Sequence, residues 1–254
     1  MCVSTTITDT AGNTSGATAG AFTLDTTAPS APTVALPEAP NSVNAAEAAS
    51  AGGTTIVTTL PADAKVGDTV TTVVTNPNGT TTTLTHVIVA AELPAAQGGT
   101  ATGTGPFTIS QLIPSSALTV DGAWTTSTTV TDLAGNASAP RTGSFVLDTT
   151  PPAAPAASLA SVSDSGTLGD SITNDTTPTI SGTGTPGDTI TVTFPGGETQ
   201  TAVVAVDGSW SVTPTNALPQ GVNNLSVTAT DPAGNVSPAT ALPVTIDTAA
   251  PAAP

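Results

Sequence analysis

The 254-residue chain carries 18 acidic residues against two basic ones, and its formal net charge of −16 excludes the phosphate backbone of nucleic acids as a partner. A hydrophobic fraction of 37% is nevertheless high enough for packed domains. A single cysteine, Cys2, excludes an internal disulfide framework, and no apolar run is long enough to predict a membrane span.

Residues 1–28 are predicted to form a β-hairpin. Strand-forming residues stand two apart in 3–7 and 22–24, and residues 9–13 (Asp-Thr-Ala-Gly-Asn) supply the turn. An isolated hairpin is marginal in water, so we expect it to be poorly ordered unless it packs on a neighbour. Since residue 3 already lies in a strand, we interpret this segment as the C-terminal hairpin of a truncated domain.

The same turn recurs twice, and each copy is followed sixteen residues later by the aspartate that ends the next strand. A constant spacing indicates the same hairpin each time, because an inserted residue would turn core side chains outward. The copies recur at domain-sized intervals, so the chain is predicted to be a string of similar domains. The turn aspartates are Asp9, Asp132 and Asp231, and the strand-ending aspartates are Asp25, Asp148 and Asp247.

Residues 29–150 are predicted to form a second domain, preceded by a short proline-rich linker. Residues 44–51 are expected to form a helical turn, and residues 98–105 a flexible loop. Strand patterns occupy residues 54–59, 69–74, 80–90, 124–131 and 142–147.

Residues 151–254 are predicted to form a third domain and the start of the next linker. Seven short strands separated by turns are typical of a β-sandwich. They are expected at residues 157–162, 178–182, 189–194, 199–206, 209–212, 224–230 and 241–246.

As a set, three motifs resemble the bacterial Ig-like repeats of large, biofilm-associated surface adhesins that are exported by type I secretion. They are the Asp-x-Ala-Gly-Asn turn, the linker Leu147–Pro152 (Leu-Asp-Thr-Thr-Pro-Pro), and the stretch Asp164–Gly182. The resemblance implies an all-β chain of tandem immunoglobulin-like β-sandwich domains without disulfides, joined by short Pro-rich linkers. It also implies structural Ca²⁺ held by Asp and Asn near the domain junctions. The second domain departs from the pattern at residues 43–47, where Val-Asn-Ala-Ala-Glu stands in place of Ile172–Asp175.

Loops at the ends of such sandwiches bring three sets of oxygen ligands together, and Ca²⁺ takes roughly six to eight of them. One set is expected where the third domain begins, comprising Asp188, Asp207, Asp231 and Asn235 with Asp148 of the linker. The matching set of the second domain is Asp68, Asp132 and Asn136 with Asp25. A further set at the opposite end of the third domain comprises Asp164, Asp170, Asn174, Asp175 and Asp247.

The alternative for each of these residues is that it caps its own turn, which is the usual reason for Asp and Asn in loops. Trp124 continues the core-facing alternation of its strand and is predicted to be buried, while Trp210 could be buried or stack on a sugar. His86 has no second His or Cys beside it, so a metal or catalytic role is not predicted. We find no nucleophile–base set and no phosphate-binding glycine loop, so the chain is not expected to be an enzyme.

The sequence therefore predicts a structural stalk segment of a secreted bacterial cell-surface adhesin that serves cell adhesion and biofilm formation. Its expected partners are neighbouring Ig-like repeats, and the chain is expected to be monomeric. Two alternatives remain open. One is a module that binds a glycan or a host protein through its loops, and the other is an accessory domain pair of a secreted polysaccharide-degrading enzyme.

Overall fold

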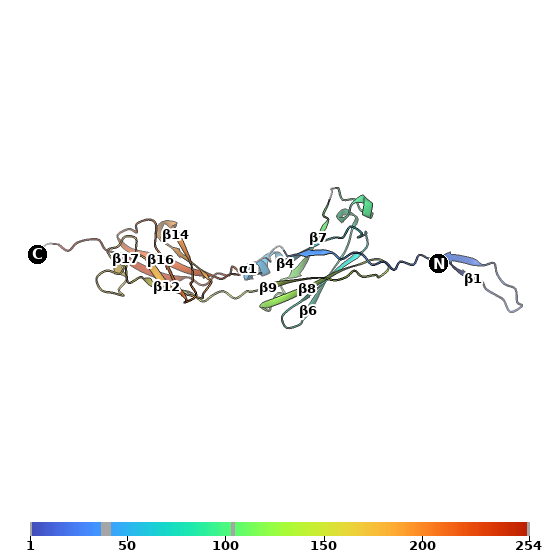
Figure 1. Cartoon of the computed structure of the whole chain (residues 1–254), viewed down its shortest axis with the longest axis horizontal. Coiled ribbons are helices and arrows are strands. Elements are labelled where there is room, and N and C mark those ends of the chain that lie inside the picture. The colour runs from blue at the N-terminus through green and yellow to red at the C-terminus, as the bar shows by residue number, and fades with distance from the viewer. Residues whose placement is uncertain (1, 37–41, 103–104, 253–254) are drawn as a thin grey trace.

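The computed structural model describes residues 2–36, 42–102 and 105–252. They form a two-stranded hairpin and two β-sandwich domains, which lie in a row along the long axis of the chain (Figure 1). Apart from strands, the described residues contain one five-residue α-helix and a few 3-10 turns, so the predicted all-β fold is confirmed. None of the described helices has the length and apolar character needed to cross a membrane.

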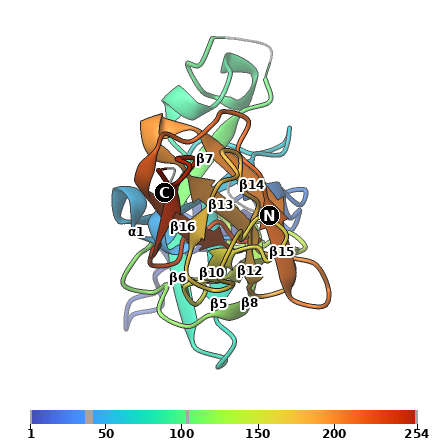
Figure 2. The ribbon, with the colours of Figure 1, turned by 90° about the vertical axis from the view of Figure 1, so that its left-hand side faces the viewer.

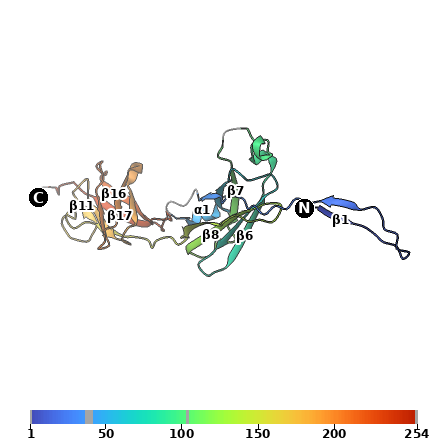
Figure 3. The same ribbon diagram turned by 45° about the vertical axis from the view of Figure 1, so that its right-hand side comes forward.

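The N-terminal hairpin pairs β1 (Cys2–Thr5) with β2 (Thr18–Ala21) in antiparallel register. This pairing is shorter than the predicted alternation, because Ile7 and Leu24 lie outside the two strands and are exposed. Figure 3 shows the hairpin extending away from the domain that follows it.

The middle domain is a sandwich of two sheets, with strand orders β3-β4-β7 and β6-β5-β8-β9. Its helix α1 (Ala45–Ala49) confirms the predicted helical turn. Asn44 caps α1 by accepting a hydrogen bond from the Glu47 amide, while the Glu47 side chain accepts one from the Asn44 amide. The strands are β3 (Thr33–Ala35), β4 (Gly53–Thr59), β5 (Thr69–Thr75), β6 (Thr81–Val87), β7 (Thr108–Pro114), β8 (Gly122–Thr131) and β9 (Arg141–Leu147).

The sequence patterns missed β3 and β7 of the middle domain and extended β6 too far. In β7 the buried position between Ile109 and Ile113 is occupied by Gln111, which hides the apolar alternation. The run predicted over 80–90 ends at Val87, because the chain then enters an insertion with 3-10 turns at Ala90–Glu92 and Ala95–Gln97. This insertion projects from the outline of the domain in Figure 2. Residues 103–104 of the predicted loop lie outside the described residues.

The C-terminal domain has sheets with strand orders β10-β12-β15 and β11-β17-β16-β13-β14. All seven predicted strands occur, with shifted ends, and the two-residue β11 pairs in parallel with β17 in addition. The strands are β10 (Ala156–Leu159), β11 (Ile172–Thr173), β12 (Ile180–Thr183), β13 (Thr189–Thr193), β14 (Thr199–Val203), β15 (Ser209–Val212), β16 (Gly221–Thr230) and β17 (Thr240–Ile246).

The two domains share local hydrogen bonds that show which positions correspond. The Asp68 amide donates to the Lys65 carbonyl as the Asp188 amide donates to the Thr185 carbonyl, both at 3.1 Å. On the penultimate strands, the Val130 amide donates to Ser138 Oγ and the Ala229 amide donates to Ser237 Oγ. Thr72 and Thr128 of the middle domain therefore correspond to Val192 and Val227.

The cores differ at these corresponding positions. The C-terminal domain has one apolar cluster that runs through both sheets. The middle domain has two apolar clusters, and a belt of buried polar residues from β4, β5, β7 and β8 separates them. Within this polar belt Thr72 Oγ1 lies 2.7 Å from Gln111 Oε1 and 2.9 Å from Thr128 Oγ1. The belt comprises Thr58, Thr72, Gln111, Thr126 and Thr128.

Both tryptophans lie in the cores. Trp124 is 1% exposed, stacks on Phe145 with ring centroids 5.7 Å apart, and donates from Nε1 to the Val120 carbonyl at 2.9 Å. Trp210 is also buried. The prediction for Trp124 is confirmed, and a sugar-stacking role for Trp210 is wrong because its ring is not accessible.

Candidate cation sites at the domain junctions

The junction between the middle and C-terminal domains contains a buried carboxylate with an unpartnered oxygen. Asp188, just before β13, is 3% exposed, and its Oδ2 has no hydrogen-bond partner. Burial and the nearby charge of Asp231 raise the pKa of Asp188 above its ordinary value. A buried carboxylate oxygen of this kind is costly unless a donor or a cation reaches it.

Asn235 connects the two domains directly. Its Oδ1 accepts a hydrogen bond from the Ala45 amide at the start of α1, at 2.9 Å. Its Nδ2 donates to the Asp148 carbonyl at 2.8 Å and to Asp231 Oδ2 at 2.9 Å. One side chain thus joins α1, the linker and the β16–β17 turn.

Asn44 adds a second connection at the same place, because its Nδ2 donates to the Ala233 carbonyl at 3.1 Å. The sequence predicted that Asp188, Asp231, Asn235 and Asp148 would meet here, and the structure places Asn235 against Asp148 and Asp188 near Asp231. The sequence gave no indication that the helical turn at Ala45–Ala49 would contribute to this junction.

Asp207 belongs to the same end of the domain by topology. Its turn lies between β14 and β15, and the neighbouring Gly208 carbonyl accepts from the Gly184 amide. Asp207 itself is exposed and accepts hydrogen bonds from the Ser209 amide and hydroxyl at 3.0 and 2.6 Å. These bonds lower the pKa of Asp207, and they are those of a turn cap.

The junction between the hairpin and the middle domain gathers four carboxylates around a pocket of about 240 Å³. Its lining includes Asp25, Asp68 and Asp132, as predicted, and also Asp63 and Lys65. Asn136 contributes as Asn235 does, because its Nδ2 donates to the Asp25 carbonyl at 3.2 Å.

Two residues of this pocket were missed from the sequence. Asp63 lies in an irregular loop without a motif, and it accepts hydrogen bonds from the amide and hydroxyl of Ser30 in the linker. The Lys65 amide donates to Asp68 Oδ2 at 2.8 Å. Burial raises the pKa of Asp68, with the Lys65 amide and ammonium opposing the shift and the charges of Asp132 and Asp63 adding to it.

The third predicted set lies in the loop before β11, directly after β11 and directly after β17. Asp164 is buried, and its Oδ2 accepts from the Gly169 amide while its Oδ1 has no partner. The other four members of the set also have hydrogen-bond partners. Asp170 accepts from the Ile172 amide, Asp175 from the Ser163 hydroxyl and the Thr177 amide, and Asp247 from Gln220 Nε2 and the Ala249 amide, while the Asn174 amide donates to Ser165 Oγ.

Turn capping accounts for the repeated Asp-x-Ala-Gly-Asn motif. Asp132 Oδ1 accepts from the Ala134 and Asn136 amides, and its Oδ2 accepts from Asn136 Nδ2 at 2.8 Å. These bonds hold the pKa of Asp132 below its ordinary value, with the Asn136 side chain contributing most. In residues 2–36, 42–102 and 105–252, no three His, Cys, Asp or Glu side chains form a group that could hold a metal ion as it stands.

The residues nevertheless fit a hard cation at two places. Asp188 Oδ2 and Asp164 Oδ1 are buried carboxylate oxygens without hydrogen-bond partners. The charge of Asp231 lies near Asp188, and Asn235 bonds both Asp231 and the backbone carbonyl of Asp148. Carboxylate and carbonyl oxygens are the ligands that Ca²⁺ prefers.

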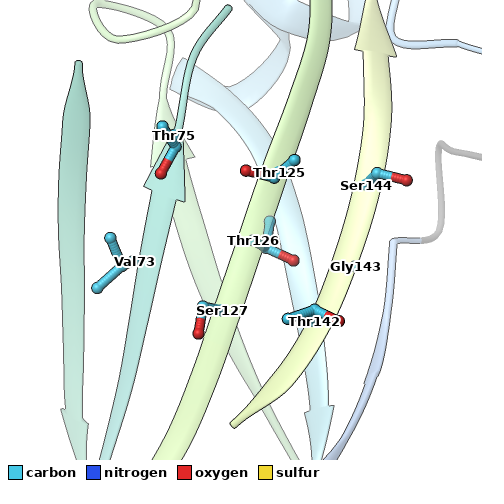
Figure 4. Close-up of a pocket in the computed structure, with 8 residues that line it drawn as sticks. All are labelled: Val73, Thr75, Thr125, Thr126, Ser127, Thr142, Gly143 and Ser144. Carbon is cyan, nitrogen blue, oxygen red and sulfur yellow. The ribbon is translucent and has the colours of Figure 1, made fainter. Parts of the chain in front are cut away.

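A shallow pocket on the outside of β5, β8 and β9 offers different chemistry (Figure 4). It has a volume of about 410 Å³, and six of its eight lining residues are Ser or Thr. The other two are Val73 and Gly143, so the lining has neither a charge nor an aromatic ring. It lacks the stacking surface that sugar recognition commonly uses.

The fold agrees with the family models that match the chain. Residues 39–149 and 151–248 each match a family model described as a bacterial Ig-like domain. The chain therefore belongs to the bacterial Ig-like domain family. No curated protein matches it.

Several solved structures resemble the chain. A Ca²⁺-stabilized adhesin that helps an Antarctic bacterium reach out and bind ice is 28% identical, with a TM-score of 0.47 over 96% of this chain and 55% of that one. A 1.5-MDa bacterial ice-binding adhesin is 25% identical, with a TM-score of 0.43 over 96% and 73%. The BSP domain of a biofilm-associated protein is 22% identical, with a TM-score of 0.29 over 85% and 30%. The chain thus spans about half the length of the first of these structures.

Proposed function

We propose that this chain is a non-catalytic stalk segment of a secreted bacterial surface adhesin, exported by type I secretion and serving adhesion and biofilm formation. Its Ig-like domains hold a distal binding region away from the cell, and Ca²⁺ bound near the domain junctions stiffens the row. The observation that carries the proposal is the Asp188 junction. There a buried carboxylate with an unpartnered oxygen lies beside direct bonds between two domains.

The chain's own residues would fix the relative orientation of the domains. Asn235 holds the linker and α1 against the C-terminal domain, and Asp121 holds the linker from the other side. Asp121 accepts hydrogen bonds from the Thr149 amide and from the hydroxyls of Thr149 and Thr150. A linker bonded on both sides bends less than its proline content alone would predict.

Asp188, Asp231 and the Asp148 carbonyl would hold the ion at this junction, and Asp25, Asp63, Asp68 and Asp132 at the preceding one. When bound, Ca²⁺ would supply positive charge that offsets the repulsion between these carboxylates. Since the ion binds the folded domains and not the unfolded chain, it would also raise their stability.

The test is thermal unfolding and small-angle scattering of the chain in EDTA and in millimolar Ca²⁺. We expect a higher melting temperature and a longer, stiffer particle in Ca²⁺. Magnesium at the same concentration is the control, because Mg²⁺ requires a nearly ideal octahedral set of ligands and binds weakly to flexible sites made only of protein oxygens. Identical melting temperatures and dimensions in EDTA and Ca²⁺ would reject the calcium-stiffened stalk.

A further inference from the structure

Lys65 occupies the position in the middle domain that Thr185 occupies in the C-terminal domain. The Asp68 amide donates to the Lys65 carbonyl, and the Asp188 amide donates to the Thr185 carbonyl. In the same way the Gly67 amide donates to the Ile88 carbonyl, and the Gly187 amide donates to the Val204 carbonyl. The Ile88 and Val204 amides return bonds of 2.8 Å to the Asp68 and Asp188 carbonyls. The two carboxylates thus sit in the same local frame, three residues after Lys65 and Thr185.

The charge around the two frames differs. Lys65 is one of only two basic residues in the chain, and it lines the pocket formed with Asp25, Asp63, Asp68 and Asp132. The corresponding Thr185 is neutral. Asp68 Oδ2 has a donor in the Lys65 amide, whereas Asp188 Oδ2 has no partner.

Lys65 and Thr185 are both exposed, so neither residue supports a core. A lysine in a pocket of carboxylates adds a fixed positive charge that stays with the protein at any calcium concentration. The same charge repels an incoming divalent cation, and in a partly exposed pocket this repulsion is weakened by water but not abolished.

We propose that Lys65 is a tethered cation that partly replaces calcium at the first junction, so that the two junctions respond to different calcium concentrations. This inference rests on the proposed binding of Ca²⁺ at both junctions. The Asp188 junction has a neutral residue at the corresponding position, so an ion binding there meets no such repulsion. The Asp68 junction keeps part of its rigidity when calcium is scarce, and it binds the ion more weakly than it would without Lys65.

The experiment is calorimetric titration of the full chain with CaCl₂, with the two binding classes assigned by Asp68→Asn and Asp188→Asn. Lys65→Thr is expected to tighten the Asp68 class on the order of tenfold, because one repelling charge is removed. Thr185→Lys is expected to weaken the Asp188 class by a similar factor. Lys65→Arg keeps the charge and serves as the matched control, with an affinity within about twofold of the unmodified chain.

The outcomes separate this inference from the proposed function. If Ca²⁺ binds at both junctions and neither Lys65→Thr nor Thr185→Lys changes its affinity, the role of Lys65 is wrong while the stalk proposal stands. If the unmodified chain binds no Ca²⁺ at either junction, both are wrong. Raising the salt concentration should shrink the effect of Lys65→Thr, and an effect independent of salt would point to altered loop structure instead of charge.

Discussion

The middle and C-terminal domains use the same strand framework with different chemistry inside it. Where the C-terminal domain has Val192 and Val227, the middle domain has Thr72 and Thr128, and Gln111 completes their hydrogen bonds. A polar belt is tolerated because these groups bond one another in the interior. The same strands therefore form around apolar or polar inward-facing side chains, provided that the polar side chains hydrogen-bond one another.

The difference between the two cores can be tested by placing one polar residue in the apolar core of the C-terminal domain. Val227→Thr buries a hydroxyl in the C-terminal cluster, and we expect it to lower the free energy of unfolding by about 2 kcal/mol, since the hydroxyl loses water without gaining a designed partner. The downward shift of the C-terminal domain's transition would be followed by scanning calorimetry. In the double variant with Val192→Thr the two hydroxyls can bond as Thr72 and Thr128 do, so its loss should be smaller than the sum of the single losses. An unchanged free energy of unfolding in Val227→Thr would show that an unpartnered hydroxyl does not destabilise this core.

Two substitutions within the polar belt should have opposite signs. Thr72→Val leaves Gln111 Oε1 without its donor and should destabilise the middle domain by about 1–2 kcal/mol. Thr126→Val removes a buried hydroxyl that has no partner and should stabilise it by up to about 1 kcal/mol. Denaturant unfolding of both variants measures the difference, and two changes of the same sign would show that hydrogen bonding does not govern the belt.

The two junctions also differ in what their asparagines bond. Asn235 accepts a hydrogen bond from helix α1 of the neighbouring domain, whereas Asn136 bonds the Asp25 carbonyl of the preceding segment. Asn235→Ala removes two bonds that cross between domains, and each such bond contributes about 1 kcal/mol. We expect a broader distribution of distances between spin labels on the middle and C-terminal domains, with little change in either domain's melting temperature. Asn136→Ala is the matched control and should leave that distribution unchanged. An unchanged distribution in Asn235→Ala would mean that the linker alone sets the geometry.

The smallest effect is expected from pH at the exposed Glu198. Hydrogen bonds from the Thr215 amide, Gln200 and Asn216 lower the pKa of Glu198 from 4.5 to about 2. Because its folded-state pKa is depressed, its contribution to stability is present above pH 4.5 and is lost as the pH falls from 4.5 to about 2. Melting temperatures over this range should fall less steeply for Glu198→Gln, and parallel slopes would exclude the contribution.

The sequence predicted the parts of the fold that depend on local pattern. The repeated turn and its constant spacing located β8, β9, β16 and β17, and the alternation around Trp124 placed its ring in the core. The pattern failed at β7, where Gln111 occupies a core position. Its partners Thr72 and Val70 lie on another strand and cannot be inferred from spacing.

The candidate sites were predictable only in outline. Loop topology brought Asp25, Asp68 and Asp132 to one pocket, but Asp63 and Lys65 reach it from an irregular loop without a motif. The bond from the Ala45 amide to Asn235 depends on how two domains orient, which no local pattern encodes. Whether Asp188 caps a turn or holds an ion depends on its burial, which became visible only in the folded chain.

The most direct test of the central claim is the melting temperature of Asp188→Asn beside that of the unmodified chain, in EDTA and in millimolar Ca²⁺ at pH 7. Without calcium the variant should be the more stable by about 1 kcal/mol, because it removes a buried charge that Asp231 repels. With calcium the order should reverse, since the unmodified domain gains about 2.7 kcal/mol at a concentration one hundred times the dissociation constant. If calcium stabilises the variant as much as the unmodified chain, or stabilises neither, Asp188 does not hold an ion and the calcium-stiffened junction is wrong.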